Sequence, residues 1–411
     1  MEGPMRILFC NDRYPGRFGK MPSVLAADPA NSVMFLSFRP GGENVSPRIR
    51  HVLLNISRDR ERLARNRDTF VAEWEKMFIL GKHALRTFAH IRETGFTPDM
   101  IFTSLFDGPG LFLRHAFPKA WIVSYFNGFR SKTADDGRFR AVMDFQRTLI
   151  AQSDLYFVRS ESQRRAFPPL LHPIIHLWPP YVDTEFFRPA PPDLSLFFPG
   201  MSPDADGELV TGHMKGSRDA QKKLLRVILD LLGRRPRCLA ALTFDSEAAL
   251  QQWRQVIQAL PARMGRRLFL AGGLDAGTYH RLLCSSSVYV FPEYESPPLQ
   301  GMLETMSCGT LLMSPVPKEG DGILLPGETM LPYPEENGQE QREAICRVLD
   351  HAVEYAALKR RARQRIEKAC GERVVFFEHL DFIMKAYGTS QKSGASHACP
   401  ERRTTAVAKH N

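Results

Sequence analysis

The sequence predicts an α/β protein built from two Rossmann-like domains, and three observations lead to this prediction. The chain has 411 residues, of which 43% are hydrophobic, so it is long enough and apolar enough for more than one core. Short apolar runs alternate with helical stretches in both halves, which is typical of parallel sheets. A proline-rich segment, 168–203, separates the halves.

In the first half, apolar runs of strand length are each entered from a turn. We expect strands at 6–10, 32–37, 100–103, 121–125 and 154–158. The longest helical stretch covers 69–95, and a shorter one lies around 145–151. This alternation predicts βαβ units and a parallel sheet.

The segment between the halves contains ten prolines. Proline lacks a backbone N–H and fixes its φ angle, so this density predicts an irregular connector. We therefore place an N-terminal domain at 1–190 and a C-terminal domain at 191–375. A return helix segment is expected at 376–389. The polar, aperiodic residues 390–411 predict a disordered tail.

The second half repeats the alternation, with helices expected at 219–233 and 246–260 and strands at 238–244, 268–270 and 288–291. Its most informative stretch, 287–315, reads as strand, loop, helix, glycine and strand. Pro297 and Pro298 suit a helix start, and Gly309 suits the left-handed position after its end. Such a helix start can bind phosphate, and Glu304 would accept hydroxyl groups beside it.

The composition limits the partners and the compartment. A formal charge of +10 suits nucleic acid, a phospholipid surface or a phosphorylated substrate, but the basic residues are spread along the chain. Nucleic-acid binding would rest on charge alone, so we do not expect it. Seven scattered cysteines without a C-x-x-C pair indicate reduced thiols. With no apolar run long enough for a signal peptide or a membrane span, we expect a cytoplasmic protein.

Residues 303–312, Leu-Glu-Thr-Met-Ser-Cys-Gly-Thr-Leu-Leu, resemble the ligand-binding helix of the family 4 glycosyltransferases. The resemblance implies a GT-B fold, in which two Rossmann-like domains face each other across a cleft. It also implies that Glu304 binds the ribose hydroxyls of a sugar nucleotide. Upstream, 267–274 and 279–283 are similar to the strand and glycine turn, here Gly272 and Gly273, that line the nucleobase pocket.

The N-terminal half is similar to a bacterial subgroup of that family. The opening strand, 5–9, is followed by a Pro-Gly-x-Phe loop, 14–18, and further matches lie at 98–101, 111–118, 124–126 and 182–189. The resemblance therefore extends from residue 5 to about residue 365. It implies that Gly16, Arg17 and Gly19 form an acceptor or cleft loop. The alternative is a plain glycine-rich strand exit.

Several positions depart from the family pattern. A first glutamate is replaced by Ser296, next to Glu295; a histidine falls on Ser104 and a glutamate on Asn127. The cationic motif for the diphosphate is reduced to Lys215, with His213 or Arg218 as a second cation. The alternative for Glu304 and for Lys215 is an ordinary solvated surface side chain without a role in binding. The resemblance assigns Lys215, Ser104 and Asn127 to catalysis and the following residues to donor binding: Glu304, Glu295, Ser296, Pro298, Leu299, Gln300, Gly272, Gly273, His213 and Arg218.

Together these features predict a hexosyltransferase-type enzyme that needs no cofactor or metal. It would transfer a sugar, with retention, from a nucleoside diphosphate sugar to a glycan, lipid-linked or protein acceptor in polysaccharide biosynthesis. A peripheral contact with the inner membrane face would suit a lipid-linked acceptor. Asp204-Ala205-Asp206 resembles a metal motif, but its setting is that of a turn. The alternative is a non-catalytic descendant that binds a sugar nucleotide or glycan as a partner or regulator.

Overall fold

The computed structural model describes residues 4–39, 45–59, 69–104, 108–126, 150, 152–165, 167, 169–178, 180–201, 207–258, 260–294, 300–317, 322–335 and 337–393. The chain divides into two compact units. We call Met1–Trp178 with His379–Asn411 the N-terminal domain and Pro179–Glu378 the C-terminal domain. The boundary expected at residue 190 therefore falls inside the second unit.

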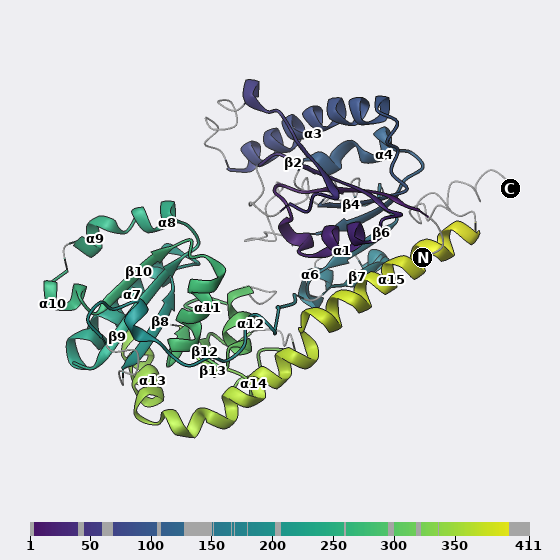
Figure 1. The fold of residues 1–411 in the computed structure, drawn as a ribbon. Coiled ribbons are helices and arrows are strands. Elements are labelled where there is room, and N and C mark those ends of the chain that lie inside the picture. Colours follow the sequence, from purple (N-terminus) through teal and green to yellow (C-terminus); the bar gives the residue numbers. More distant parts are fainter. Residues whose placement is uncertain are drawn as a thin grey trace. The chain divides into compact units, whose positions relative to one another are not determined.

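The N-terminal domain contains a seven-stranded parallel sheet in the order β3-β2-β1-β4-β5-β6-β7. Figure 1 shows helices α1 and α3 on opposite faces of this sheet. The bounds are β1 (Arg6–Cys10), α1 (Met21–Ala27), β2 (Ser32–Ser37), β3 (Ile49–Leu53), α3 (Thr69–Glu93), β4 (Met100–Ser104), α4 (Leu113–Ala116), β5 (Trp121–Tyr125), β6 (Leu155–Val158), α6 (Glu161–Arg165) and β7 (Ile175–Leu177).

Stacked aromatic side chains hold the central strands together. Phe9 of β1 lies between Phe35 and Phe102 of its two neighbours, with ring centroids 5.9 and 4.7 Å away. All three rings are fully buried. Strands covered on both faces need such continuous apolar sequence, which is why these runs could be recognised in the sequence.

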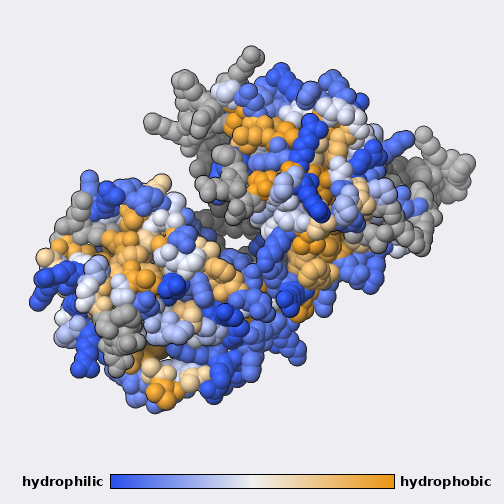
Figure 2. Space-filling model, in the orientation of Figure 1, coloured by the Kyte–Doolittle hydropathy of each residue, from blue (hydrophilic) through white to orange (hydrophobic). Residues whose placement is uncertain are grey.

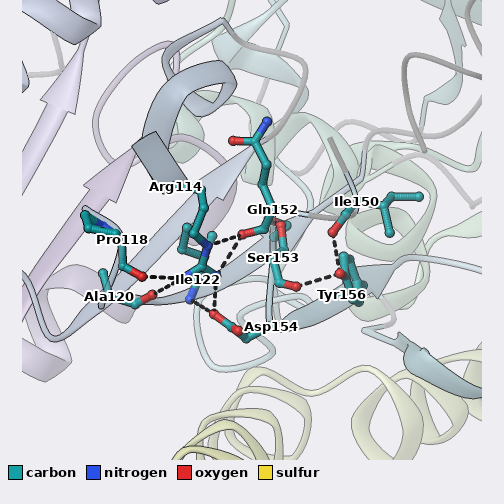
Figure 3. Close-up of polar contacts among 10 residues, drawn as sticks. Arg114, Pro118, Ala120, Ile122, Ile150, Gln152, Ser153, Asp154 and Tyr156 are labelled. Atoms are coloured by element: carbon teal, nitrogen blue, oxygen red, sulfur yellow. Dashed lines mark hydrogen bonds and ion pairs between the residues drawn. The ribbon is translucent and has the colours of Figure 1, made fainter. Parts of the chain in front are cut away.

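The amino ends of β5 and β6 are joined by a dense polar network (Figure 3). Arg114 donates to the backbone carbonyls of Gln152 and Ala120, at 2.9 Å each, and to Asp154 Oδ2 at 2.6 Å. Asp154 Oδ2 also accepts from the N–H of Ile122 at 2.8 Å. The Asp154 carboxylate is nearly buried, so its charge is offset by these donors rather than by water.

The C-terminal domain contains a six-stranded parallel sheet in the order β10-β9-β8-β11-β12-β13. Its strands and helices run as β8 (Glu208–His213), α7 (Arg218–Arg234), β9 (Cys238–Phe244), α8 (Glu247–Gln251), α9 (Arg254–Gln258), α10 (Ala262–Gly265), β10 (Leu268–Gly272), α11 (Ala276–Ser285), β11 (Val288–Val290), α12 (Gln300–Ser307), β12 (Leu311–Ser314), β13 (Leu331–Pro332), α13 (Gly338–Asp350) and α14 (Ala356–Ala369).

Two expectations about helices are wrong. The single helix expected at 246–260 is divided into α8 and α9, because Trp253 turns into the core, where it is 3% exposed and donates to Gln221 Oε1 at 3.1 Å. The return segment is longer than expected: α15 (Glu372–Ser393) continues through 390–393, where the sequence predicts the start of the tail. Residues 394–411 and all of the helix expected around 145–151 except Ile150 lie outside the described ranges.

The surface of each domain is mixed in character. On the faces visible in Figure 2, hydrophilic and hydrophobic residues are interspersed on both domains. Within the described part of the chain, no helix combines the length and the apolar character that crossing a bilayer requires.

Candidate functional site

The C-terminal sheet has a topological switch point between β8 and β11. The chain continues from β8 through α7 to β9 on one side, whereas β11 pairs with β8 on the other. In open α/β sheets, ligands bind beside the carboxyl ends of the strands at such a point. The polar residues that end or follow these strands are His213 on β8, Asp245 after β9 and Glu293 after β11.

A chain of polar contacts starts at Lys215 and runs into the domain. Lys215 Nζ lies 3.6 Å from Asp245 Oδ2, and His213 Nε2 lies 3.5 Å from Asp245 Oδ1. The other ring nitrogen of His213 is 3.2 Å from Thr243 Oγ1, which in turn is 2.6 Å from the hydroxyl of Tyr289. The hydrogen bond with His213 and the charge of Lys215 lower the pKa of Asp245, so this carboxyl is ionised at neutral pH.

The loop that carries Lys215 is held by Glu293. Glu293 accepts from the backbone N–H of Ser217 at 2.7 Å and from the Ser217 hydroxyl. Gly216 has a φ of +93°, and a Cβ there would lie only 2.2 Å from Glu293 Oε2. Ser217 also caps α7 by accepting from Ala220 N. The loop is therefore fixed on both sides, whereas the side chain of Lys215 remains 36% exposed and can reach a ligand.

The two candidates for a second cation have different surroundings. The guanidinium of Arg218 stacks on Trp253, 3.7 Å from the ring centroid, and donates to the carbonyl of Gln252 at 3.4 Å. His213 instead belongs to the network that contains Lys215. The geometry therefore brings His213 and Lys215 together through Asp245, while Arg218 is held by contacts with Trp253.

Glu304 lies on α12, where it is half-buried. Burial raises its pKa to about 7, against the opposing effect of a hydrogen bond with Gln300. Gly301 allows α12 to approach α11, since a Cβ there would lie 2.8 Å from the hydroxyl of Tyr279. Burial is the main cause of the raised pKa of Tyr279, and the charges of Tyr289 and Glu304 add to it. Glu304 is thus close to the inner end of the polar network.

The glycine turn after β10 has a packing explanation. A Cβ at Gly272 would lie 2.7 Å from backbone atoms of Ser246 and Glu247, so only glycine permits this approach of α8. Gly273 has a φ of +68°, in the left-handed region. Gln300, at the start of α12, donates to the carbonyl of Tyr181 at 3.0 Å. These contacts fix the backbone around the expected nucleobase pocket.

Several predicted site residues lie outside the described ranges, namely Asn127, Glu295, Ser296, Pro298, Leu299 and the Asp204–Asp206 turn. The helix start expected to hold a phosphate is described only from Gln300 onward.

The N-terminal sheet has its own switch point, between β1 and β4. Asn11, directly after β1, is 1% exposed, and neither its side-chain nitrogen nor its oxygen has a hydrogen-bond partner within the described part of the chain. The same holds for the hydroxyl of Ser104, which ends β4 and is fully buried. Two buried polar groups therefore lie at the ends of adjacent strands without partners, an arrangement that native proteins mostly avoid.

The loop after β1 covers Asn11. Gly16 has a φ of +55°, and a Cβ there would lie 1.9 Å from Asn11 Nδ2, so this position requires glycine. Gly19 also has a positive φ, of +53°. Phe18 anchors the loop: it is fully buried, with its ring 5.1 Å from Phe9 and 5.5 Å from Tyr125. Nothing is described of the side chain of Arg17.

Sequence reasoning missed Asn11, Asp245 and Glu293. A signal was present, because Asn11 and Asp245 are the first polar residues after buried parallel strands and Glu293 follows β11 closely. Such residues lie at the edge where ligands bind.

Comparison with known families identifies the N-terminal half. Residues 29–187 match the glycosyl transferase family 4 group. This part of the chain is therefore similar to the family 4 glycosyltransferases. This match confirms the resemblance inferred from the sequence, although the Pro-Gly-x-Phe loop lies before the matched residues. No curated protein matches the chain.

Solved structures identify the fold of the whole chain. Sucrose-phosphate synthase from Thermosynechococcus elongatus is 16% identical, with 94% of this chain and 100% of that chain covered and a TM-score of 0.69. Trehalose 6-phosphate synthase from Burkholderia multivorans is 12% identical, with 95% and 100% covered and a TM-score of 0.67. HepE from Anabaena, in complex with UDP and glucose, is 13% identical, with 93% and 100% covered and a TM-score of 0.64. The fold is GT-B, with two Rossmann-like domains, as predicted.

Proposed function

We propose that the chain transfers a hexose-type sugar from a nucleoside diphosphate sugar to a glycan, lipid-linked or protein acceptor, with retention and without a metal. The observation that carries the proposal is the edge of the C-terminal sheet. This edge carries the partly exposed Lys215, the ionised Asp245 and the half-buried carboxyl of Glu304. This combination suits a ligand that offers both a diphosphate and vicinal hydroxyls.

In the proposed complex, the ionised Glu304 accepts hydrogen bonds from the ribose hydroxyls. The ammonium of Lys215 stabilises the negative charge that develops on the diphosphate as the bond from the anomeric carbon to the phosphate oxygen breaks. Asp245 holds Lys215 in place at 3.6 Å, and His213 adds a second polar group. The acceptor oxygen forms the new bond to the same carbon, and its proton passes to the departing diphosphate.

We assign the acceptor to the N-terminal domain, at the loop with Gly16, Arg17 and Gly19. Asn11 and Ser104 would provide its polar contacts, since both are buried without partners among the residues described. A serine hydroxyl is not a base at neutral pH, so Ser104 would orient the acceptor rather than take its proton. Catalysis would then depend on positioning and on stabilising the leaving group.

The compared structures support the donor class. The Anabaena protein was solved in complexes with UDP and glucose and with UDP-glucose. We therefore expect the donor to be a nucleoside diphosphate sugar, with uridine as the first base to test. We also expect a cytoplasmic protein whose formal charge of +10 favours peripheral contact with an anionic membrane that carries a lipid-linked acceptor.

A second candidate function rests on the substitutions at Ser104, Asn127 and Ser296. They remove a histidine and two glutamates that the family pattern would place there. A non-catalytic descendant would still bind a sugar nucleotide or glycan, as a partner or regulator. Donor binding without turnover would favour this alternative.

The test is a thermal-shift screen against nucleoside diphosphates and their sugars, with the full chain and two variants. We expect a donor to raise the Tm of the wild type and to lose most of this effect in Glu304→Ala. The matched control is Glu343→Ala, which changes an exposed glutamate on α13 of the same domain and should keep the full shift. Responding donors are then assayed for hydrolysis and transfer. If no nucleotide shifts the wild type, the proposal is wrong.

A further inference from the structure

A cluster of soft metal ligands lies in the C-terminal domain. His280 and Cys284 are four residues apart on α11, so their side chains project from the same face of the helix. Cys308 directly follows α12 and is 4% exposed. The imidazole nitrogen and the two sulfur atoms all lie within 4.8 Å of one another, with Cys284 Sγ 3.3 Å from His280 Nε2.

A backbone oxygen faces the same point. The carbonyl of Arg188 accepts from His280 Nε2 at 2.7 Å and from Cys284 Sγ at 3.4 Å. Three side chains and one carbonyl, drawn from three separate segments, therefore converge. Imidazole and thiolate are the ligands that zinc prefers in proteins.

The three segments are fixed before any ion binds. Ser307, next to Cys308, donates its hydroxyl to the carbonyl of Phe187, and Arg363 bridges the carbonyls of Phe187 and Ser307. Thr310 donates to the carbonyl of Leu283 at 2.5 Å, which ties the segment after α12 to α11 beside Cys284. A site held in this way loses little conformational entropy on binding, which favours affinity.

The spacing of the imidazole nitrogen and the first sulfur is near that of two ligands of a tetrahedral ion. Zinc–sulfur bonds of about 2.3 Å and zinc–nitrogen bonds of about 2.0–2.1 Å place tetrahedral N and S ligands about 3.6 Å apart and two S ligands about 3.8 Å apart. The observed spacing of 3.3 Å between Nε2 and Sγ is within a few tenths of an ångström of that value.

We propose that His280, Cys284 and Cys308 bind Zn²⁺, with the Arg188 carbonyl or a water as the fourth ligand. On binding, each thiol that is still protonated releases its proton. The hydrogen of His280 moves from Nε2 to Nδ1, so that the hydrogen bond from Nε2 to the Arg188 carbonyl is replaced by a bond from Nε2 to the metal.

The ion would join α11, the end of α12 and the segment at Arg188. Because α12 also carries Glu304, the metal would stiffen the helix on which the proposed donor contact lies. Its role is structural, since no sugar or phosphate is needed to explain it. The inference therefore stands independently of the proposed transfer reaction.

The experiment loads the metal-depleted full chain with Co²⁺ as a spectroscopic probe and then displaces it with Zn²⁺. We expect thiolate-to-metal charge-transfer bands and tetrahedral ligand-field bands at one ion per chain. Cys284→Ser and Cys308→Ala should each weaken metal binding by more than about 100-fold. Mutating a residue that only hydrogen-bonds to a metal ligand already lowers metal affinity by about 10- to 100-fold. The control is Cys346→Ser, which alters a half-buried cysteine on α13 of the same domain and should leave the spectrum unchanged.

Folding of each variant is checked by circular dichroism before titration, so that loss of the bands cannot be confused with unfolding. An octahedral spectrum, or a tetrahedral one that persists in the folded Cys284→Ser variant, would overturn the proposal. So would a chain that forms a Cys284–Cys308 disulfide with hydrogen peroxide but binds no metal when reduced. Donor-induced thermal shifts measured on the same samples report separately on the proposed function.

Discussion

Buried polar groups at the amino ends of the strands in the N-terminal sheet differ from those at the carboxyl ends in how they are hydrogen-bonded. We call these two sides of the sheet its amino edge and its carboxyl edge. At the amino edge, Arg114 and Asp154 meet several partners each, with distances down to 2.6 Å (Figure 3). At the carboxyl ends of β1 and β4, Asn11 and Ser104 are more deeply buried than Arg114, but their side chains have no hydrogen-bond partner among the residues that the structure describes. A buried polar group without a partner costs about 1–3 kcal/mol. The paired groups at the amino ends stabilise the fold, whereas Asn11 and Ser104 are the groups that we propose to contact the acceptor.

The carboxyl edge of the C-terminal sheet is intermediate between these extremes. Lys215, His213 and Asp245 are paired with one another, yet Lys215 keeps 36% of its side chain exposed. Pairing holds the ionised groups in place, and exposure lets one of them reach a ligand. The contrast can be tested by removing one group from each edge and comparing the changes in stability.

The largest change is expected for Arg114→Ala. It leaves the carboxylate of Asp154, whose side chain is only 4% exposed, without its main cationic partner. Breaking a buried pair in this way costs about 3–5 kcal/mol. Urea unfolding at pH 7 measures the loss, with Arg86→Ala on the exposed face of α3 as the control. A loss below about 1 kcal/mol would show that the network is dispensable.

A somewhat smaller effect is expected from the ionisation of Glu304. Burial raises its pKa from 4.5 to about 7, so the folded state binds a proton more tightly than the unfolded chain does. The contribution of this group to stability is therefore complete below pH 4.5 and is lost as the pH rises to about 7, by up to about 3 kcal/mol.

Glu304→Gln should abolish that part of the pH dependence. Unfolding free energies are measured at pH 5 and pH 8 for both proteins, so that other titrating groups cancel in the comparison. A wild type and a variant with identical pH dependence would contradict a buried Glu304 and would remove it from the proposed donor site.

Two serines on adjacent strands of the N-terminal sheet provide the next test. Ser104 and Ser124 are both fully buried, but Ser124 is hydrogen-bonded to Ser153, whereas Ser104 has no partner in the described part of the chain. Ser124→Ala should destabilise the protein by about 1 kcal/mol, and Ser104→Ala should be neutral or stabilise it by up to about 1 kcal/mol. Chemical denaturation distinguishes the two signs. Equal losses would mean that Ser104 also has a partner.

Much of the fold follows from the sequence because each strand is buried on both faces. The runs at 6–10 and 32–37 match β1 and β2 residue for residue. The expectation for 246–260 failed because the local helical pattern says nothing of Trp253, whose burial against Gln221 ends α8. Such long-range packing is not encoded in a window of neighbouring residues.

The candidate site was less predictable than the fold. His213 and Lys215 could be named from the sequence, but their partner Asp245 could not, since the pairing depends on β8 and β9 lying side by side. Asn11 was missed for the same reason: its importance comes from a burial that only the covering loop creates. Sequence indicates which strand ends carry polar residues, whereas the structure decides which of them meet.

The smallest effect on stability, and the most direct test of chemistry, is expected for Lys215→Met. Its ion pair with Asp245 is exposed, and such pairs contribute less than about 1 kcal/mol. If Lys215 stabilises the departing diphosphate, kcat/KM for transfer should fall about 100- to 1,000-fold, as expected when one electrostatic contact to the transition state is removed.

Lys223→Met is the matched control, because Lys223 is also a partly exposed lysine paired with an aspartate, Asp219 at 3.3 Å, on the adjoining helix α7. Steady-state kinetics on both variants, with urea unfolding alongside, separate the two roles. Equal activity of both variants would leave Lys215 as a surface lysine and would transfer its proposed role to another cation of the same edge.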